Sequence, residues 1–350
     1  MAQQNQLRVG PSPHTSAELT TGRMMLDVII ALIPVTVAAA VLFRWEALRV
    51  PLICVATCAV TELIFNLCRK KPNSLCDFSA VVTGLILAFS VPLDLPIFAC
   101  VIGSAVAVGI GKMLFGGLGS NIFNPAMVGR AFLMICFGQL MTTWTVPAIG
   151  GMAEVYATTR ATPLAAAKFI ESDKAKALAE VSQAEYEKSL QVRSGDPKVL
   201  GDLFLGTTGG CLGETSAVLI LLGGAYLLFR KTISYHIPVG MIAAILIIAS
   251  LGYHFAPDRV MHPLAHLFAG GAMFGAFFIA TDPVSSPLSN TGRWIFGIGV
   301  GVLVMVIRVF SGYPEGVMFA VLIMNSIAPL IDRWTVATPL GARLKIASSS

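Results

Sequence analysis

The sequence predicts an all-α polytopic membrane protein with about ten transmembrane helices. Of its 350 residues, 55% are hydrophobic and 12% are charged, whereas a typical soluble domain carries about 25% charged residues. The mean hydropathy is +0.78. Apolar blocks of about 16 to 20 residues follow one another, near the length that crosses a hydrocarbon core of roughly 30 Å. This composition excludes a soluble enzyme.

The apolar blocks define the predicted spans. The third and eighth blocks are short, so we interpret them as half-helices or re-entrant segments, which are tolerated only inside protein or around a cavity. The predicted spans are residues 24–43, 50–68, 78–92, 97–115, 127–143, 213–229, 237–255, 267–281, 294–311 and 315–331.

The distribution of basic residues orients these spans. Cytoplasmic loops carry an excess of Lys and Arg, and long translocated loops do not count toward this rule. With both termini in the cytoplasm, most Lys and Arg residues of the short segments lie on the cytoplasmic side. The predicted divisions are a cytoplasmic N-terminal segment 1–23, a first membrane repeat 24–143, an extracytoplasmic insert 144–212, a second membrane repeat 213–331 and a cytoplasmic tail 332–350.

Five spans precede the insert and five follow it. A repeat with an odd number of spans inserts in opposite orientations, so we predict two inverted five-helix repeats with broken or half-helices. Pro, small residues and Asn or Asp interrupt both halves, at 116–125 and at 281–287. Broken helices of this kind often form a binding site near the midplane, which makes Asn121 and Asn124 candidate cofactor-binding residues. The alternative is that the glycines only permit close helix packing.

Charged residues inside the predicted spans are candidates for ion passage, because such charges are costly in a membrane. The alternative for each is a snorkelling side chain or a charge paired for packing. The candidates for the ion pathway are Asp282, Glu62, Lys112 and Glu214, with Asp27 and Arg130 as second choices.

We assign no metal site. The seven cysteines contain no Cys-x-x-Cys pair and fall mostly inside apolar blocks, so we interpret them as small buried hydrophobes. His262 and His266 have the spacing of one helix face, which permits a metal or haem, but Pro263 favours a loop or helix start. The net charge of +5 comes from short loops without a basic stripe, so we expect no nucleic-acid partner.

The insert contains the run Thr158-Thr159-Arg160-Ala161-Thr162-Pro163-Leu164. Thr followed by Pro is a good helix start, because Thr caps a helix and Pro suits its first turn. The residues from 164 to 190 are rich in strong helix formers. From the residues alone, Thr162 is therefore a helix cap.

Longer motifs add a family resemblance over essentially the full length. They are Phe123-Asn124-Pro125-Ala126-Met127, 234–240 (SYHIPVG), 273–284 (MFGAFFIATDPV), Gly292-Arg293, Ile307-Arg308 and Gly312-Tyr313-Pro314. With these motifs the chain resembles the D subunits of the Rnf electron-transport complex, which are similar to the B subunits of the sodium-pumping NADH:quinone oxidoreductase. The fold implied by the resemblance is similar to the urea-channel-like architecture.

The resemblance implies a covalent FMN. In the family, a flavin transferase links FMN through its phosphate to the last Thr of a Ser/Thr-Gly-Ala-Thr-like motif, which corresponds to Thr162. Thr159 matches the upstream Ser/Thr, and Pro163 follows the attachment site. The phosphodiester would lie at a helix N-terminus, which favours anions, and Arg160 could contact it. The chain departs from the family pattern at Arg160, which replaces Gly, and at Tyr156, where Asp is common.

A second copy of the short motif lies near the C-terminus. Thr335-Val336-Ala337-Thr338-Pro339-Leu340 has the same Thr-x-Ala-Thr-Pro-Leu pattern. The predicted topology places Thr338 in the cytoplasm and Thr162 outside. Because attachment in the family occurs outside the cytoplasm, the topology selects Thr162.

The resemblance also implies a function. The chain would be a membrane component of an ion-translocating ferredoxin:NAD oxidoreductase complex in a bacterial inner membrane, with residues 144–212 in the periplasm. Its partners would be the A, B, C, E and G types of Rnf protein, and a second, non-covalent flavin could occupy the helix bundle. The alternatives are a flavin-free channel or secondary transporter of inverted-repeat type and a scaffold without a cofactor.

Overall fold

The computed structural model describes most of the predicted membrane region. The described residues are 20–43, 46–70, 74–142, 144–145, 159–160, 190–205, 211–214, 216–257, 260–313 and 315–335. Within them, long apolar runs form five helices that are long and apolar enough to cross a membrane. These are α1 (Thr21–Phe43), α2 (Glu46–Cys68), α12 (His236–Phe255), α15 (Asn290–Phe310) and α16 (Val317–Trp334).

Shorter apolar helices lie between the long ones. They are α3 (Ser79–Phe89), α4 (Ile97–Val108) with its π-helical continuation η2 (Gly109–Met113), α5 (Pro125–Cys136) and α11 (Ala217–Phe229). The fifth span was predicted to reach residue 143, but α5 ends at Cys136. Phe137 leaves the helical conformation ahead of Gly138, and a separate short helix, α6 (Gly138–Met141), follows.

The eighth segment is broken, as its short apolar block predicts. It consists of α13 (Pro263–Phe268), α14 (Ala272–Phe274) and the π-helix η4 (Gly275–Ile279). Gly270 adopts a φ of +76° between the first two pieces, a conformation that favours glycine. The remaining elements are η1 (Leu75–Asp77), η3 (Leu212–Glu214), α10 (Pro197–Leu205) and the two-residue strands β1 (Trp144–Thr145) and β2 (Thr159–Arg160), which pair antiparallel.

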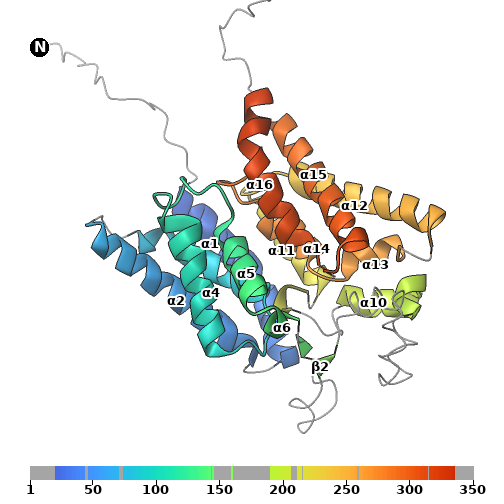
Figure 1. Ribbon diagram of the computed structural model, residues 1–350, viewed down its shortest axis with the longest axis horizontal. Helices are drawn as coiled ribbons and strands as arrows, with labels where there is room; N and C mark the ends of the chain where they lie inside the picture. The colour runs from blue at the N-terminus through green and yellow to red at the C-terminus, as the bar shows by residue number, and fades with distance from the viewer. Residues whose placement is uncertain are drawn as a thin grey trace, which may run out of the picture.

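The N-terminal and C-terminal halves lie side by side (Figure 1). In the first half α4 packs against α2 and α5, and in the second half α15 packs against α12 and α16. Among the contacts that join the halves, α1 packs against α11, and α5 packs against α16. Each of these two contacts pairs helices of the same rank in their halves, the first with the first and the fifth with the fifth.

Glycines permit close helix contacts in both halves. A Cβ atom at Gly84 would lie 2.7 Å from the Cα of Val55, and one at Gly297 would lie 2.6 Å from the carbonyl oxygen of Ile237. Neither distance leaves room for a side chain. At the predicted break, by contrast, Gly117 and Gly119 have positive φ values of +109° and +93° and open space around an added Cβ atom, so these two glycines do not serve close helix packing.

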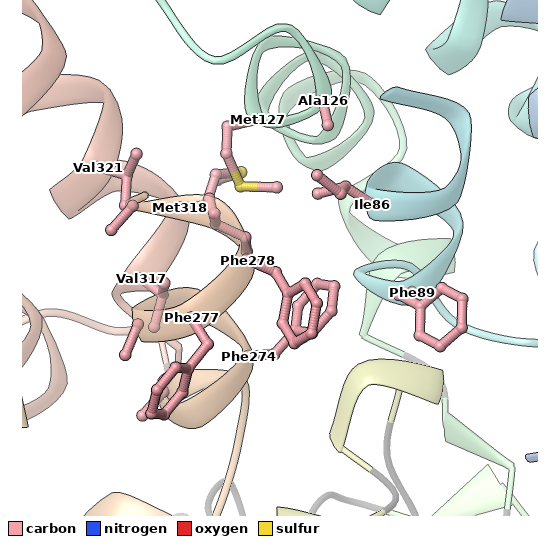
Figure 2. Packing of buried hydrophobic residues seen from close by; sticks show 14 of the residues in the cluster. Ile86, Phe89, Ala126, Met127, Phe274, Phe277, Phe278, Val317, Met318 and Val321 are labelled. Carbon is pink, nitrogen blue, oxygen red and sulfur yellow. The ribbon is translucent and has the colours of Figure 1, made fainter. Parts of the chain in front are cut away.

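Three phenylalanine rings meet where the halves join. Phe89 stacks on Phe274 with ring centroids 5.9 Å apart, and Phe274 stacks on Phe278 with centroids 5.3 Å apart. All three rings are buried. Figure 2 shows these rings between helices of the two halves, beside Ile86 and Met318. We call them the phenylalanine stack.

Candidate functional site

A pocket lies between the two halves, and we call it the amide pocket. The space inside it, together with its opening to solvent, is about 730 Å³. Its walls come from the starts of α1 and α3, from η2, from residues 118–126, from the end of α11 with residues 232–233, and from residues 277–283. Its polar lining residues are Ser79, Thr83, Lys112, Asn121, Asn124, Thr232, Thr281 and Asp282.

Asn124 fixes one wall of the amide pocket. Its Oδ1 accepts from the backbone N–H groups of Ala126 and Met127 and so caps α5, while Pro125 takes the first helical position. Its Nδ2 donates to the carbonyl of Ile279 in the other half, at 3.2 Å. Asn124 therefore ties the helix start to the end of η4, and most of its hydrogen-bonding capacity is used.

Asn121 is different, because it has a free acceptor. Its Nδ2 donates to the carbonyl of Phe123 at 3.0 Å. Its Oδ1 is buried and has no hydrogen-bond partner within the described residues. A buried polar atom without a partner costs free energy. In a pocket wall, such an oxygen suits a ligand that donates an N–H.

Lys112 and Glu62 form a buried ion pair beside the pocket. The Lys112 Nζ lies 2.8 Å from the Glu62 Oε2, and it also donates to the Ser79 Oγ. Lys112 lines the pocket, and Glu62 lies behind it with its other oxygen bound to the Ser74 hydroxyl. The two candidate ion-pathway residues thus neutralise each other.

Asp282 lies at the other wall of the amide pocket, three residues after the end of η4. Its Oδ2 accepts from the Ser285 hydroxyl at 2.8 Å, and its Oδ1 accepts from the Val284 N–H. These bonds close a turn at the helix break. The structure therefore gathers Asn121, Asn124, Lys112 and Asp282 around one pocket, although they come from both halves.

The groups of the lining are complementary in chemistry to a planar heterocycle such as the ring of a flavin. The pyrimidine edge of a flavin carries one N–H donor between two carbonyl acceptors. The Asn121 Oδ1 can accept from that N–H, and the Lys112 ammonium can donate to a carbonyl. Phe277 and Phe278, with Ile86 and Leu118, supply apolar walls for the ring faces.

Glu214 lies in a second site, which we call the carboxyl cluster. The cluster consists of Cys211, Glu214 and Glu315, whose ligand atoms all lie within 4.8 Å of one another, together with Arg130. The Arg130 guanidinium pairs with the Glu315 Oε2, and both side chains are largely buried. Donor atoms so placed could hold a metal ion, but the arginine already neutralises one carboxylate.

The phenylalanine stack lies between the two sites. Phe278 lines the amide pocket. On the other side, a Cβ atom at Gly213 would lie 2.7 Å from the carbonyl oxygen of Phe89 and 3.1 Å from the ring of Phe274, and Glu214 is the next residue. The stack thus separates the amide pocket from the carboxyl cluster by stacked apolar side chains.

Asp27 and His262, which the sequence singled out, have structural partners, whereas the cysteines have no disulfide partners. Asp27 accepts hydrogen bonds from Tyr226, Arg230 and Thr232, which joins the start of α1 to the end of α11. His262 is the N-cap of α13, with its Nδ1 accepting from the Leu264 N–H, as the following proline predicts. The prediction that the cysteines are buried is confirmed for four of the seven free thiols, Cys54, Cys58, Cys100 and Cys211, and is wrong for Cys68, Cys76 and Cys136, which are exposed.

Sequence reasoning missed Glu315 and Ser79. Glu315 is the first residue of the predicted tenth span, 315–331, and was not among the candidate site residues. The two intramembrane arginines, Arg130 and Arg308, were the available signal, because a buried guanidinium requires acceptors. Arg308 instead donates to the backbone carbonyls of His266 and Ala269.

Part of the candidate flavin attachment site lies outside the described residues. Thr162 and Pro163 are among the residues that the structure does not describe, as is Thr338. The backbone of Thr159 and Arg160 forms β2, where Arg160 pairs with Trp144 and Thr159 pairs with Thr145. The assignment of FMN to Thr162 thus stays a prediction.

Comparisons with known proteins give consistent matches. A family model described as the NQR2, RnfD, RnfE family matches residues 8–341. The chain is 38% identical over 339 residues to the D subunit of the proton-translocating ferredoxin:NAD(+) oxidoreductase complex of Clostridium ljungdahlii, with 97% of both chains covered. It is 40% identical over 332 residues to the D subunit of the Na(+)-translocating ferredoxin:NAD(+) oxidoreductase complex of Acetobacterium woodii, covering 94% of this chain and 93% of the relative. It is also 41% identical over 317 residues to the D subunit of the ion-translocating oxidoreductase complex of Stutzerimonas stutzeri, covering 89% of each.

Proposed function

Because this chain belongs to the NQR2, RnfD, RnfE family, we propose that it is the D subunit of an ion-translocating ferredoxin:NAD oxidoreductase complex. It would be a non-autonomous component of an oxidoreduction-driven translocase. The observation that carries the proposal is the near full-length similarity to relatives that bear this name. Those two relatives are named for different ions, proton and sodium, so their names leave the coupling ion of this chain open.

The first part of the proposal is a covalent FMN on Thr162. A phosphodiester requires a hydroxyl, which Thr162 supplies within the Thr-x-Ala-Thr-Pro-Leu run. The described strand pair β1 and β2 joins the chain on either side of residues 146–158 just before this run. FMN accepts one or two electrons, which suits a relay between carriers, and the protein supplies its position and surroundings.

The second part is a non-covalent flavin in the amide pocket. The free acceptor of Asn121, the Lys112 ammonium and the apolar walls support it. When bound, this flavin would supply a second station for electrons. The residues of the chain would hold its polar edge and exclude water from its faces.

The third part is ion movement between the two sites. Asp282 lies at the amide pocket and Glu214 lies in the carboxyl cluster, with the phenylalanine stack between them. The cluster has two carboxylates and one paired arginine. A proton or a sodium ion shared by Glu214 and Glu315 would balance the remaining charge, because uncompensated buried charge is costly.

The proposal includes the inverted-repeat architecture. The matching helix contacts within each half, and the contacts of α1 with α11 and of α5 with α16, support a pseudo-twofold relation. In that arrangement both termini are cytoplasmic in a bacterial inner membrane, and residues 144–212 are periplasmic. Partner Rnf proteins would carry the iron–sulfur centres and the nicotinamide site, and a flavin transferase would attach the FMN.

Flavin fluorescence of the denatured chain on a gel tests the proposal. The chain would be produced with a flavin transferase as wild type, Thr162→Ala and Thr338→Ala. We expect fluorescence in the wild type and in Thr338→Ala, and none in Thr162→Ala. A non-fluorescent wild type would favour a flavin-free transporter or scaffold, and loss only in Thr338→Ala would move the attachment site to the C-terminal motif.

A further inference from the structure

Lys112 is a buried cation at a pocket wall. Lys112 is 1% exposed and lies in the π-helix η2, which follows the end of α4. The π-helical turn packs tightly, since a Cβ atom at Gly111 would lie 2.9 Å from the Cα of Pro125. Single π-turns in helices are rare and occur frequently at functional sites. The geometry thus holds the base of Lys112 against the start of α5.

Two of the three N–H groups of the ammonium have partners among the described residues. One donates to the Glu62 Oε2 at 2.8 Å and one to the Ser79 Oγ. An ammonium has three donors. Because Lys112 also lines the amide pocket, its third N–H is available to a molecule bound there.

The partners of Lys112 are themselves fixed. The other Glu62 oxygen is bound by the Ser74 hydroxyl, which in turn accepts from the Asn66 Nδ2 at 2.9 Å. The Ser79 hydroxyl donates to the Asp77 Oδ1. A side chain held by such a chain of hydrogen bonds keeps its direction without a ligand, so little ordering is required when a ligand binds.

The charge of this network depends on Glu62. The Glu62 carboxylate lies 2.8 Å from the Lys112 ammonium and offsets part of its positive charge. Glu62 is 0% exposed and is absent from the pocket lining, so the carboxylate lies behind the ammonium. The pair therefore presents the positive end of a fixed dipole to the pocket.

We propose that Lys112 is a positioning residue for the non-covalent flavin. Its third N–H donates to the edge of the ring that carries N1 and the C2 carbonyl. This contact favours the reduced flavin over the oxidised flavin. This inference rests on the second flavin of the proposed function. Two-electron reduction with uptake of one proton leaves the ring with one negative charge, which is spread over N1 and the C2 carbonyl. The electrons come from the reduced carriers of the complex, and no proton leaves Lys112.

Stabilisation of the negatively charged ring explains why we expect Lys112 to raise the midpoint potential of the flavin. A hydrogen bond between two charged groups is roughly twice as strong as one between neutral groups, so an ammonium binds the anionic ring more tightly than the neutral ring. Glu62 has the opposite effect, because its carboxylate offsets part of the positive charge. Removal of Lys112 and removal of the Glu62 charge should therefore move the midpoint potential in opposite directions.

A purely structural role for the pair makes a different prediction. The pair joins α2, the start of α3 and η2, so its loss would lower the stability of the fold. A structural role would lower it in both variants and would give no opposite shifts of the flavin potential.

The test uses the full-length chain with Thr162→Ala, in detergent, so that no covalent flavin on that residue contributes. Riboflavin is added as the probe, and its binding and midpoint potential are measured by fluorescence and by a spectroscopic redox titration. The variants are Lys112→Met, Glu62→Gln and, as a matched control, Arg69→Met. Arg69 is an exposed cation at the end of α2 and is absent from the pocket lining.

We expect Lys112→Met to lower the ratio of reduced to oxidised riboflavin affinity by about tenfold, which corresponds to a potential about 30 mV lower for a two-electron couple. Glu62→Gln should raise the potential, and Arg69→Met should leave it unchanged. If Lys112→Met binds no riboflavin, the potential of Glu62→Gln alone tests the inference: a higher potential than in the parent chain supports it, and an equal or lower potential overturns it. Equal potentials in all variants, or shifts of Lys112→Met and Glu62→Gln in the same direction, would overturn the inference.

Failure of the inference is separable from failure of the proposed function. If the Thr162→Ala chain binds no riboflavin, the role of Lys112 is overturned. In-gel fluorescence of the wild-type chain then still decides whether the protein is a covalent flavin carrier.

Discussion

The amide pocket and the carboxyl cluster both place buried polar groups where the two halves meet, but their groups suit different ligands. The pocket has an open volume, a free acceptor on Asn121 and a cation that Glu62 already balances. In the cluster, two carboxylates and a thiol crowd within 4.8 Å, beside the guanidinium of Arg130. The first arrangement suits a cofactor ring and the second suits a single small cation. In the proposed function, a neutral hydrogen-bonding group that faces open space thus distinguishes the cofactor site from the ion site.

The largest effect on stability that we expect comes from a substitution in the carboxyl cluster. Arg130→Met removes the partner of Glu315 and leaves buried carboxylates without compensation, at a cost of about 4 kcal/mol in the free energy of unfolding. The loss should shrink as the pH falls, because protonation neutralises the carboxylates. Thermal unfolding in detergent measures it, with Arg69→Met as the exposed control. Equal stability of the two variants would show that the cluster is not a closed charge network.

The phenylalanine stack keeps the two sites apart. Phe274→Ala should lower the free energy of unfolding by about 3 kcal/mol, because it opens a cavity between two buried rings. It should also raise passive ion leakage through proteoliposomes. Phe255→Ala is the control, since Phe255 is 80% exposed. An unchanged leak in a folded Phe274→Ala protein would remove the stack from the ion pathway.

The free acceptor of Asn121 sharpens the assignment of the amide pocket. Asn121→Leu should weaken riboflavin binding about tenfold, the effect of losing one hydrogen bond and leaving a ligand N–H unpaired. A fluorescence titration of the full-length Thr162→Ala chain measures the affinity. Unchanged affinity would mean that riboflavin does not contact this wall.

A substitution at Asn124 should have the smallest effect on stability and should affect riboflavin affinity less than one at Asn121. Asn124→Ala removes the cap of α5 and should cost about 1 kcal/mol in stability, together with the bond to Ile279. Riboflavin affinity should fall less than in Asn121→Leu, because the Asn124 side chain is mostly occupied. If Asn124→Ala weakened riboflavin binding more than Asn121→Leu, then Asn124 and not Asn121 would be the main contact of riboflavin.

The helices were predictable because hydrophobic length is a local property. The apolar blocks gave the order of the helices and the short third and eighth segments. Their ends were less predictable: α5 stops at Cys136 because of the backbone at Phe137, which an apolar window does not detect. The π-helical turns η2 and η4 depend on packing against other helices and leave no periodic signal.

The site was predictable only as residue types. Asn121, Asn124 and Asp282 were identified because polar residues beside a helix break are unusual in apolar segments. Their common pocket depends on contacts such as the one between Asn124 and Ile279, which are 155 positions apart. The pairings of Lys112 with Glu62 and of Arg130 with Glu315 are equally non-local, so single charges looked like ion carriers although they have partners in the structure.

The most direct test of the central claim uses membrane vesicles that contain the whole complex. NAD⁺ reduction by reduced ferredoxin and the uptake of sodium or protons would be followed together, in the wild type and in an assembled Thr162→Ala complex. We expect the variant to lose most of both activities, because the electron relay and ion movement are coupled. Wild-type rates of both in the variant would contradict the assignment of this protein as a flavin-dependent electron carrier.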